Sequence, residues 1–179
     1  ETGRELEYAI RTPARARKRI AIVGGGPSGM KAAAVAAERG HDVTLYDKAS
    51  RLGGQVLLAQ ALPGRFEFGG LVTNLQREVH DAGVSVRRNV VVTEEMVLSD
   101  LPDAVVIATG AVPYHPPGQF EDAHVVTAWD VLENRAKVGN SVVVADWRCD
   151  WVGFGIAEKL ASEGCSVRLY VNGDTAGQM

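Results

Sequence analysis

The sequence predicts an α/β fold with a parallel sheet, followed by the start of a second unit of the same kind. Short apolar runs alternate with amphipathic stretches along most of the 179 residues, and this alternation is typical of βαβ units. A glycine-rich turn at 24–29 joins the first apolar run to the first amphipathic stretch. The alternation resumes near residue 141 and stops after two further apolar runs, so we expect the second unit to be incomplete.

The residues on both sides of the turn predict the first strand and the first helix. Residues 19–23 form a short apolar strand, and the helix extends from the turn to about residue 39. Gly40 then stands where a left-handed C-terminal cap is expected. A second strand follows at 43–46, and Asp47 ends it. The apolar residues of the helix recur at the i, i+3, i+4, i+7 spacing of one packed face: Met30, Ala33, Ala34 and Ala37.

The middle of the chain is predicted to contain a loop, a helix and three strands. Residues 51–64 form the loop, with a short helix inside it as an open alternative, and an amphipathic helix runs from Phe68 to Val79. The strands are expected to be short. They lie at 84–88, at 90–93 after a break at Asn89, and at 103–108, where an apolar run predicts a buried strand.

The second half begins with a proline-containing segment at 112–118, which we expect to cross between domains. A strand, a helix and another strand then follow. They are predicted at 141–145, 155–163 and 165–171. The expected domains are therefore a linker at 1–18, a nucleotide-binding domain at 19–113 and a partial second domain at 114–179.

Composition excludes several classes of protein. The net charge of −3 provides no basic surface for nucleic acid, and no apolar run reaches the roughly 18 residues of a membrane span. The two cysteines, Cys149 and Cys165, are too few for a disulfide framework and cannot alone form a zinc or iron–sulfur site. A cytoplasmic location, without a membrane or nucleic-acid partner, is the expectation.

The glycine turn is the motif with the most specific chemistry. Gly24-x-Gly26-x-x-Gly29 follows an apolar strand and opens a helix, and Asp47 ends the next strand. Gly24 permits the tight turn, Gly26 lets a pyrophosphate approach the backbone, and Gly29 lets the helix pack closely on the sheet. The helix N-terminus offers unpaired N–H groups to phosphates. Asp47 can accept hydrogen bonds from both ribose hydroxyls and would repel a 2′-phosphate, so this context predicts a Rossmann-like dinucleotide-binding domain.

Three further segments are similar to a known family: Arg51-Leu52-Gly53-Gly54-Gln55, Ala61-Leu62-Pro63-Gly64-Arg65 and Ala108-Thr109-Gly110. Together with the glycine turn and Asp47, they resemble the C-terminal FAD/ADP-binding region of the NADH:flavin oxidoreductase family. That family includes trimethylamine, dimethylamine and histamine dehydrogenases, N-methylproline demethylase and 2,4-dienoyl-CoA reductase. The resemblance implies an FAD/NAD(P)-binding fold here. It also implies an N-terminal TIM barrel with FMN and a [4Fe–4S] cluster, and both are absent from these residues.

The resemblance also implies cofactor contacts at matching positions. Ser28, beside Pro27, would meet the pyrophosphate through its backbone, and Asp47, followed by Lys48, would bind the adenosine ribose. The other implied contacts serve the rest of the nucleotide. Gly54 and Gln55 would line the pyrophosphate or ribityl stretch, Arg65 would supply positive charge, Val92 would bond the adenine edge, and Thr109 and Gly110 would bring backbone close to the cofactor. For Arg65 a solvated loop arginine, and for Val92 a simple core residue, are equal alternatives.

The second unit departs from the family's reductases. Their second glycine turn, for NAD(P)H, should follow the strand at 141–145, but residues 146–153 read Asp-Trp-Arg-Cys-Asp-Trp-Val-Gly. Trp147 and Trp151 would block a pyrophosphate, and Asp146 and Asp150 would repel it. These carboxylates could instead take the place of an anion near the next helix. Cys149 has a redox thiol as its functional alternative, but a buried cysteine is the leading interpretation.

Three functions follow as hypotheses. The first is an FAD- or ADP-binding domain of an iron–sulfur flavoprotein that oxidises or demethylates an amine and passes electrons to another protein. The second is the FAD domain of an NAD(P)H-dependent reductase, and the third is a non-redox module in which ADP is structural. No catalytic residue or metal ligand is visible, so the chain alone is expected to be inactive, and the full-length enzyme is expected to be a homo-oligomer.

Overall fold

The computed structural model describes residue 3 and residues 12–115 and 124–174. The expected linker at 1–18 and the proline-containing segment at 112–118 therefore lie partly outside the described residues. The chain divides into two compact units. The first contains residues 1–56 and 69–110, and the second contains residues 57–68 and 111–179. The expected boundary between the two domains was at 113/114, and the segment 57–68 was expected in the first of them.

The first unit is built on a four-stranded parallel sheet. The strands are β1 (Arg19–Val23), β2 (Asp42–Asp47), β3 (Ser85–Arg88) and β4 (Ala104–Ile107), in the order β3-β2-β1-β4. β1 is the central strand between β2 and β4, with Val23 level with Tyr46 on one side and with Ile107 on the other. The carboxyl ends of the parallel strands consequently meet at one edge of the sheet, the edge at which the glycine turn begins. The α/β fold with a parallel sheet is confirmed.

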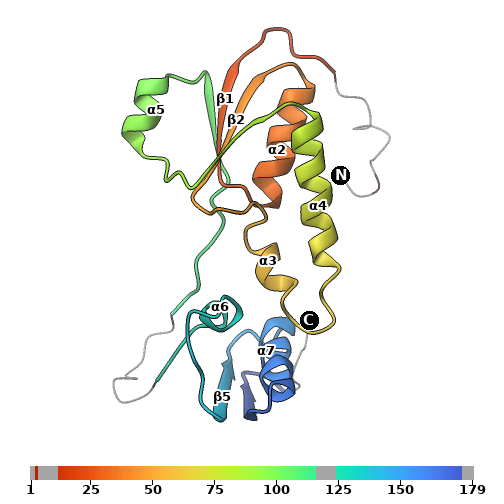
Figure 1. Ribbon diagram of the computed structural model, residues 1–179, viewed down its shortest axis with the longest axis vertical. Coiled ribbons are helices and arrows are strands. Elements are labelled where there is room, and N and C mark those ends of the chain that lie inside the picture. Colours follow the sequence, from red (N-terminus) through yellow and green to blue (C-terminus); the bar gives the residue numbers. More distant parts are fainter. Residues whose placement is uncertain (1–2, 4–11, 116–123, 175–179) are drawn as a thin grey trace. The chain divides into compact units, whose positions relative to one another are not determined.

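Two helices cover one face of this sheet, α2 (Pro27–Glu38) and α4 (Phe68–Asp81) (Figure 1). Side chains alternate between the two faces of a strand, so every second residue of β1 and β2 meets these helices. The predicted apolar face of α2 supplies part of the core, and Gly40 ends the helix with a φ of 93°. The fully or nearly fully buried residues on this side are Ile22, Met30, Ala33, Ala34, Val43, Leu45, Val72, Leu75 and Val79.

A short helix, α5 (Glu94–Asp100), lies over the other face of the sheet. It was not predicted, and the strand expected at 90–93 is wrong. Asn89 does break the chain, because its backbone adopts a left-handed φ of 58°. Thr93 then caps α5, its side chain accepting a hydrogen bond from the Met96 backbone N–H. The pairing with β2 accordingly ends at Arg88, directly before Asn89.

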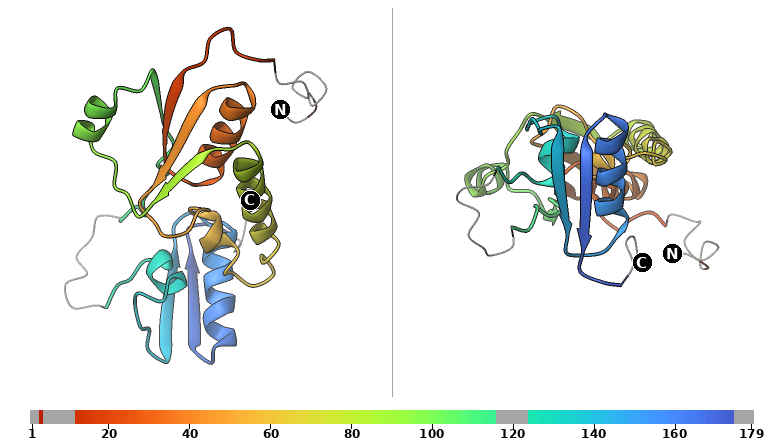
Figure 2. Two further views of the ribbon diagram at one scale, coloured as in Figure 1. Left: turned by 45° about the horizontal axis from the view of Figure 1, so that its top comes forward. Right: turned by 90° about the horizontal axis from the view of Figure 1, so that it is seen from below.

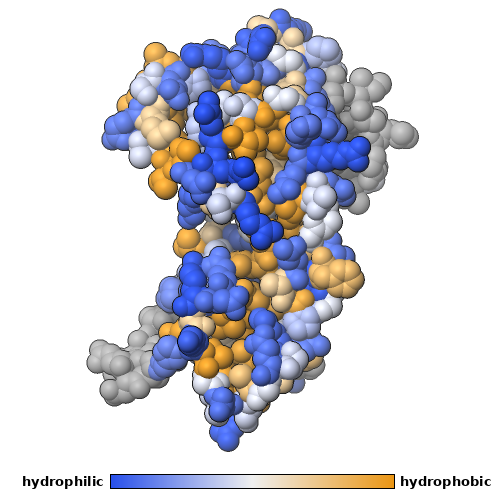
Figure 3. All heavy atoms as spheres, in the orientation of Figure 1, coloured by the Kyte–Doolittle hydropathy of each residue, from blue (hydrophilic) through white to orange (hydrophobic). Residues whose placement is uncertain are grey.

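The strand β4 is apolar but is not buried, contrary to the prediction. All four of its residues are exposed, and Ile107 is 77% exposed. The physical reason is that β4 is the edge strand of the described sheet, with β1 as its one neighbour. On the face drawn in Figure 3, apolar residues of the first unit reach the surface among polar ones.

The second unit contains a two-stranded parallel sheet, β5 (Ser141–Asp146) and β6 (Ser166–Val171), with α7 (Trp151–Ser162) along one face (Figure 2). α7 begins four residues before the predicted start. A capping box of Thr127 and Asp130 begins α6 (Ala128–Leu132), a helix that was not predicted. The short helix α3 (Val56–Ala59) realises the alternative left open within the 51–64 loop.

The segment 57–68 joins the second unit for a simple packing reason. Leu62 is 4% exposed and forms one buried cluster with Ile156 and Leu160 of α7. Phe68 stacks on Trp151 with ring centroids 6.3 Å apart, and the guanidinium of Arg65 lies 4.8 Å from the centroid of the same indole. A loop that belongs to the first half of the sequence therefore completes the core of the second unit.

Candidate nucleotide-binding site

The three fingerprint glycines occupy positions that fit their predicted roles. Gly24 has a φ of 111°, a left-handed conformation that favours glycine, and a Cβ there would overlap the Ala108 carbonyl oxygen. A Cβ on Gly29 would overlap the carbonyl oxygen of Gly24, so the first turn of α2 packs directly on the strand–helix turn. Gly26 differs from both, because a Cβ at this position would meet no atom within 4 Å. The open side of the turn is therefore at Gly26.

The N-terminus of α2 begins at this open side. Gly26 is the N-cap residue and offers no side chain to its own helix, and Pro27 occupies the first helical position. Met30 donates its backbone N–H to the Gly26 carbonyl. The N–H groups of Ser28 and Gly29 have no carbonyl one turn earlier within the helix, so they are available to an anion together with the positive end of the helix dipole. The Ser28 side chain is exposed.

Asp47 lies at the carboxyl end of β2 and holds the backbone around the turn. Its Oδ2 accepts a hydrogen bond from Gly25 N–H at 2.5 Å, and its Oδ1 accepts one from Ala49 N–H at 2.6 Å. Each carboxylate oxygen can accept a second hydrogen bond. The carboxylate is partly exposed, so it remains open to donors such as ribose hydroxyls while it fixes the glycine turn.

The segment 53–55 returns to the same turn. Gly53 N–H donates to the Gly25 carbonyl at 2.8 Å, and a Cβ on Gly54 would come within 3.0 Å of the Gly26 Cα. The amide nitrogen of the Gln55 side chain lies 3.1 Å from the place where a Cβ on Gly110 would stand. The structure thus brings together Gly26, Gly54, Gln55 and the Thr109-Gly110 segment, which were predicted from separate parts of the sequence.

The remaining predicted residues lie in three different places. Lys48 is exposed directly after β2. Val92 is partly buried on the segment that leads into α5, and Val90 N–H donates to the Asp47 carbonyl at 3.0 Å, which anchors this segment to the end of β2. Arg65 belongs to the second unit and stacks on Trp151. Its contact with the nucleotide stays a prediction.

Gly25 is a site residue that the sequence analysis missed. A Cβ on Gly25 would come within 2.7 Å of the Asp47 Oδ2 and would overlap the Leu52 side chain. The absence of a side chain at Gly25 therefore allows its N–H to reach the carboxylate. Three consecutive glycines were the signal, since the dinucleotide fingerprint accounts only for the first and the third of them.

The turn after β5 is filled by its own acidic side chains. Asp146 Oδ1 accepts hydrogen bonds from the backbone N–H groups of Arg148 and Cys149, both at 3.0 Å. Asp150 is the N-cap of α7 and accepts from Val152 N–H at 2.9 Å, while Arg148 Nε pairs with it at 2.8 Å. As expected from the sequence, carboxylates occupy the places where a bound anion would accept hydrogen bonds.

The packing around Asp146 and Cys149 reinforces this arrangement. Asp146 Oδ2 is buried without a hydrogen-bond partner in the described structure, and a Cβ on Gly153 would overlap the same carboxylate. Trp147 is 62% exposed beside the turn, and Cys149 is only 7% exposed, in line with a packed rather than a reactive thiol. A cavity of about 320 Å³ adjoins the turn and includes Asp146 and Trp147 in its lining, but that lining has no lysine or arginine to bind a phosphate.

In the described part of the chain, His, Cys, Asp and Glu side chains form no group that could hold a metal ion. Within the same residues, no helix has the length and apolar character needed to cross a membrane.

The sequence model of the pyridine nucleotide-disulphide oxidoreductase family matches residues 18–144, which include the glycine turn, Asp47 and the first four residues of β5. The match ends within the strand that precedes the filled turn.

Two curated relatives align with nearly all of the chain. N,N-dimethylglycine/sarcosine dehydrogenase of Chromohalobacter salexigens is 36% identical over 94% of this chain and 26% of its own length. NADH oxidase of Thermoanaerobacter brockii is 38% identical over 93% of this chain and 26% of its own length. The chain thus spans about a quarter of each relative, and the two identities do not separate a dehydrogenase from an NADH-dependent enzyme.

A solved structure of 2-naphthoyl-CoA reductase has the same arrangement of elements. It superposes with a TM-score of 0.86 and 31% identity over 93% of this chain and 25% of that one. This similarity supports the predicted FAD/NAD(P)-binding fold.

Proposed function

Because the chain belongs to the pyridine nucleotide-disulphide oxidoreductase family, we propose that its first unit binds FAD through the ADP part, or ADP itself. The observation that carries the proposal is the open space at Gly26, at the N-terminus of α2 and near the carboxylate of Asp47. A pyrophosphate fits this cradle, since it needs close backbone approach and N–H donors. A bound flavin would supply electron transfer, and the residues of this chain position its nucleotide part.

We propose further that the full-length protein is an iron–sulfur flavoprotein that oxidises or demethylates an amine. The filled turn after β5 supports this choice, because such an enzyme passes electrons to another protein and needs no nicotinamide in the second unit. FMN and a [4Fe–4S] cluster would lie with the substrate site in a TIM barrel outside these residues. The enzyme would be a cytoplasmic homo-oligomer. The similarity to N,N-dimethylglycine/sarcosine dehydrogenase is consistent with this class.

A second candidate is the FAD domain of an NAD(P)H-dependent reductase. The similarity to NADH oxidase and to 2-naphthoyl-CoA reductase favours it. The contents of the 146–153 turn argue against it, since they leave no glycine between Ala145 and Gly153. A non-redox module with structural ADP is the third candidate, and the visible spectrum of the bound nucleotide would identify it.

The substitution Asp47→Asn tests nucleotide binding. We expect the binding free energy of ADP to weaken by about 1–3 kcal/mol, the size of a hydrogen bond to a charged group. Isothermal titration calorimetry on the 179-residue chain measures this loss. Asp42→Asn, at the opposite end of β2, is the matched control and should leave ADP affinity unchanged.

A second ligand separates ribose binding from the support that Asp47 gives to the Gly25 amide. Loss of the 2′-hydroxyl, in 2′-deoxy-ADP, should weaken binding to the wild type more than to Asp47→Asn, because the two changes remove the same contact. Equal ADP affinity of the wild type and Asp47→Asn would contradict the proposed role.

We expect the second unit not to bind NADPH. At ~4 Å and an effective dielectric of 20, each contact between a ligand phosphate and Asp146 or Asp150 would cost on the order of 4 kcal/mol. Arg148 pairs with one of these carboxylates and leaves the other uncompensated. NADPH fluorescence is titrated with a Gly26→Val chain, in which the first site is blocked. Saturable binding below ~100 μM that is lost on Arg148→Ala, which removes the positive charge of this turn, would support the reductase class instead.

A further inference from the structure

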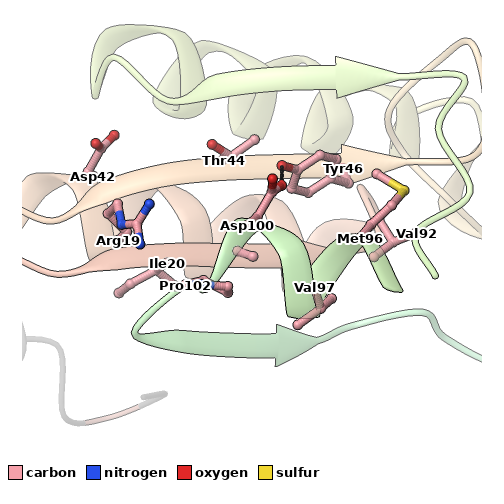
Figure 4. A pocket seen from close by; sticks show the side chains of 11 residues that line it. Arg19, Ile20, Asp42, Thr44, Tyr46, Val92, Met96, Val97, Asp100 and Pro102 are labelled. Carbon is pink, nitrogen blue, oxygen red and sulfur yellow. Dashed lines mark hydrogen bonds between the residues drawn. The ribbon is translucent and has the colours of Figure 1, made fainter. Parts of the chain in front are cut away.

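The helix α5 is held on the sheet by polar links rather than by a buried apolar face. None of its residues is buried, and a cavity of about 180 Å³ separates it from the strands (Figure 4). Thr44 and Tyr46 of β2 line this cavity from the sheet, and Met96, Val97 and Asp100 line it from α5. Since apolar contact is so limited, the few hydrogen bonds between α5 and the strands determine where the helix lies.

Two side chains of the sheet make these links. Tyr46 Oη donates to Asp100 Oδ2 at 3.4 Å, across the cavity, and Figure 4 shows the two side chains pointing toward each other. Arg19 Nη2 donates to the Leu101 carbonyl at 2.6 Å, at the end of α5. Burial and the neighbouring Asp100 carboxylate raise the pKa of Tyr46, so the phenol stays protonated and can donate at neutral pH.

The carboxyl end of β2, at Tyr46 and Asp47, also determines the course of the chain before α5. Val90 N–H donates to the Asp47 carbonyl, and Thr93 caps the helix. Val92 lies between these two fixed points, so its main chain cannot shift unless the helix shifts. Tyr46 and Asp47 are adjacent, which means that one strand end positions both the candidate ribose ligand and the helix that follows the candidate adenine contact.

We propose that Tyr46 and Asp100 are positioning residues that set the purine specificity of the nucleotide site by fixing α5, and with it the main chain at Val92. This inference rests on the proposed nucleotide-binding function. Adenine presents an acceptor at N1 beside an amino donor at N6, whereas hypoxanthine presents a donor at N1 beside an acceptor at O6. A main-chain segment held in one position can match the donor and acceptor pattern of adenine, and it then opposes the reversed pattern of hypoxanthine. A segment that can slide accommodates both.

The test compares ADP with inosine diphosphate, IDP, by calorimetry on the full 179-residue chain. In Tyr46→Phe, which removes only the hydroxyl, ADP affinity should fall about three- to tenfold, the effect of one hydrogen bond. IDP affinity should change less, so the ADP-to-IDP affinity ratio should fall at least about threefold. Asp100→Ala should have the same effect, and the double variant should lose no more than either single variant, because both break one link.

Ser99→Ala is the matched control, because Ser99 Oγ bonds the Met96 carbonyl within α5 and does not reach the sheet. It should leave the affinity ratio unchanged. Equal weakening of ADP and IDP in Tyr46→Phe would indicate a merely structural role and would overturn the inference, as would a similar change of ratio in Ser99→Ala. A wild-type chain that binds neither nucleotide would overturn the proposed function itself.

Discussion

Replacing Gly26 by valine should abolish strong ADP binding while leaving the ligand-free fold intact. A Cβ at Gly26 would meet no protein atom within 4 Å, and the φ of −73° is open to any residue, so we expect the ligand-free backbone to accept the substitution without strain. The loss of a glycine N-cap should cost less than about 1 kcal/mol of unfolding free energy. The valine would stand where the pyrophosphate must approach the backbone. We therefore expect ADP affinity to fall at least about 100-fold, or roughly 2.7 kcal/mol.

Gly70→Val is the matched control for this substitution. Gly70 lies in α4, and a Cβ there would also meet nothing within 4 Å. Calorimetry with ADP and urea unfolding on both variants measures affinity and stability separately. Unchanged ADP affinity in Gly26→Val would show that the nucleotide does not use this turn.

Gly29→Ala should destabilise the first unit itself, whereas Gly26→Val should leave its fold intact. In an ordinary helix, glycine to alanine stabilises by up to about 1 kcal/mol. Here the new methyl group would overlap the Gly24 carbonyl oxygen, and it would also come within 3.4 Å of the Ala108 side chain. Gly24 is tied to the sheet, since its N–H donates to the Tyr46 carbonyl at 2.8 Å. The first turn of α2 must therefore move away from the sheet, and we expect a loss of about 2–3 kcal/mol in unfolding free energy.

Urea unfolding followed by circular dichroism measures this loss. Gly70→Ala, in the open part of α4, should show the ordinary stabilisation by up to about 1 kcal/mol. A stabilised Gly29→Ala chain would refute the close helix–sheet packing that the fingerprint predicts.

The sequence predicted the glycine turn well because its constraints are local. A positive φ at Gly24, the open position at Gly26 and the close packing at Gly29 each follow from a fixed spacing between a strand and a helix. The limits of β1 were also predictable, since an apolar run ended directly at the turn.

The less predictable features depend on residues far apart in the sequence. The exposure of β4 depends on which strand lies beside it, and its apolar composition suggested a buried strand instead. Leu62 joins α7 across almost a hundred positions, and nothing in the 57–68 segment indicates that partner. The helix α5 has no buried apolar face, so the hydrophobic periodicity that reveals α4 is missing.

In the candidate site, too, some features follow from the local sequence and others depend on residues far apart in it. Its glycines and Asp47 could be predicted from the motif, whereas the link between Tyr46 and Asp100 joins residues 54 positions apart. Arg65 was assigned from a resemblance in sequence, and its observed contact with Trp151 depends on where its loop folds.

The filled turn after β5 has a consequence for competition. Asp146 and Asp150 belong to the same loop as the N–H groups from which they accept hydrogen bonds. Because the carboxylates are tethered there, their effective concentration at those N–H groups is far above that of any free anion. A dinucleotide in solution must displace these carboxylates, and they cannot diffuse away. Raising its concentration would therefore gain little. Recovering a site here would require removal of the tethered carboxylates rather than a tighter-binding nucleotide.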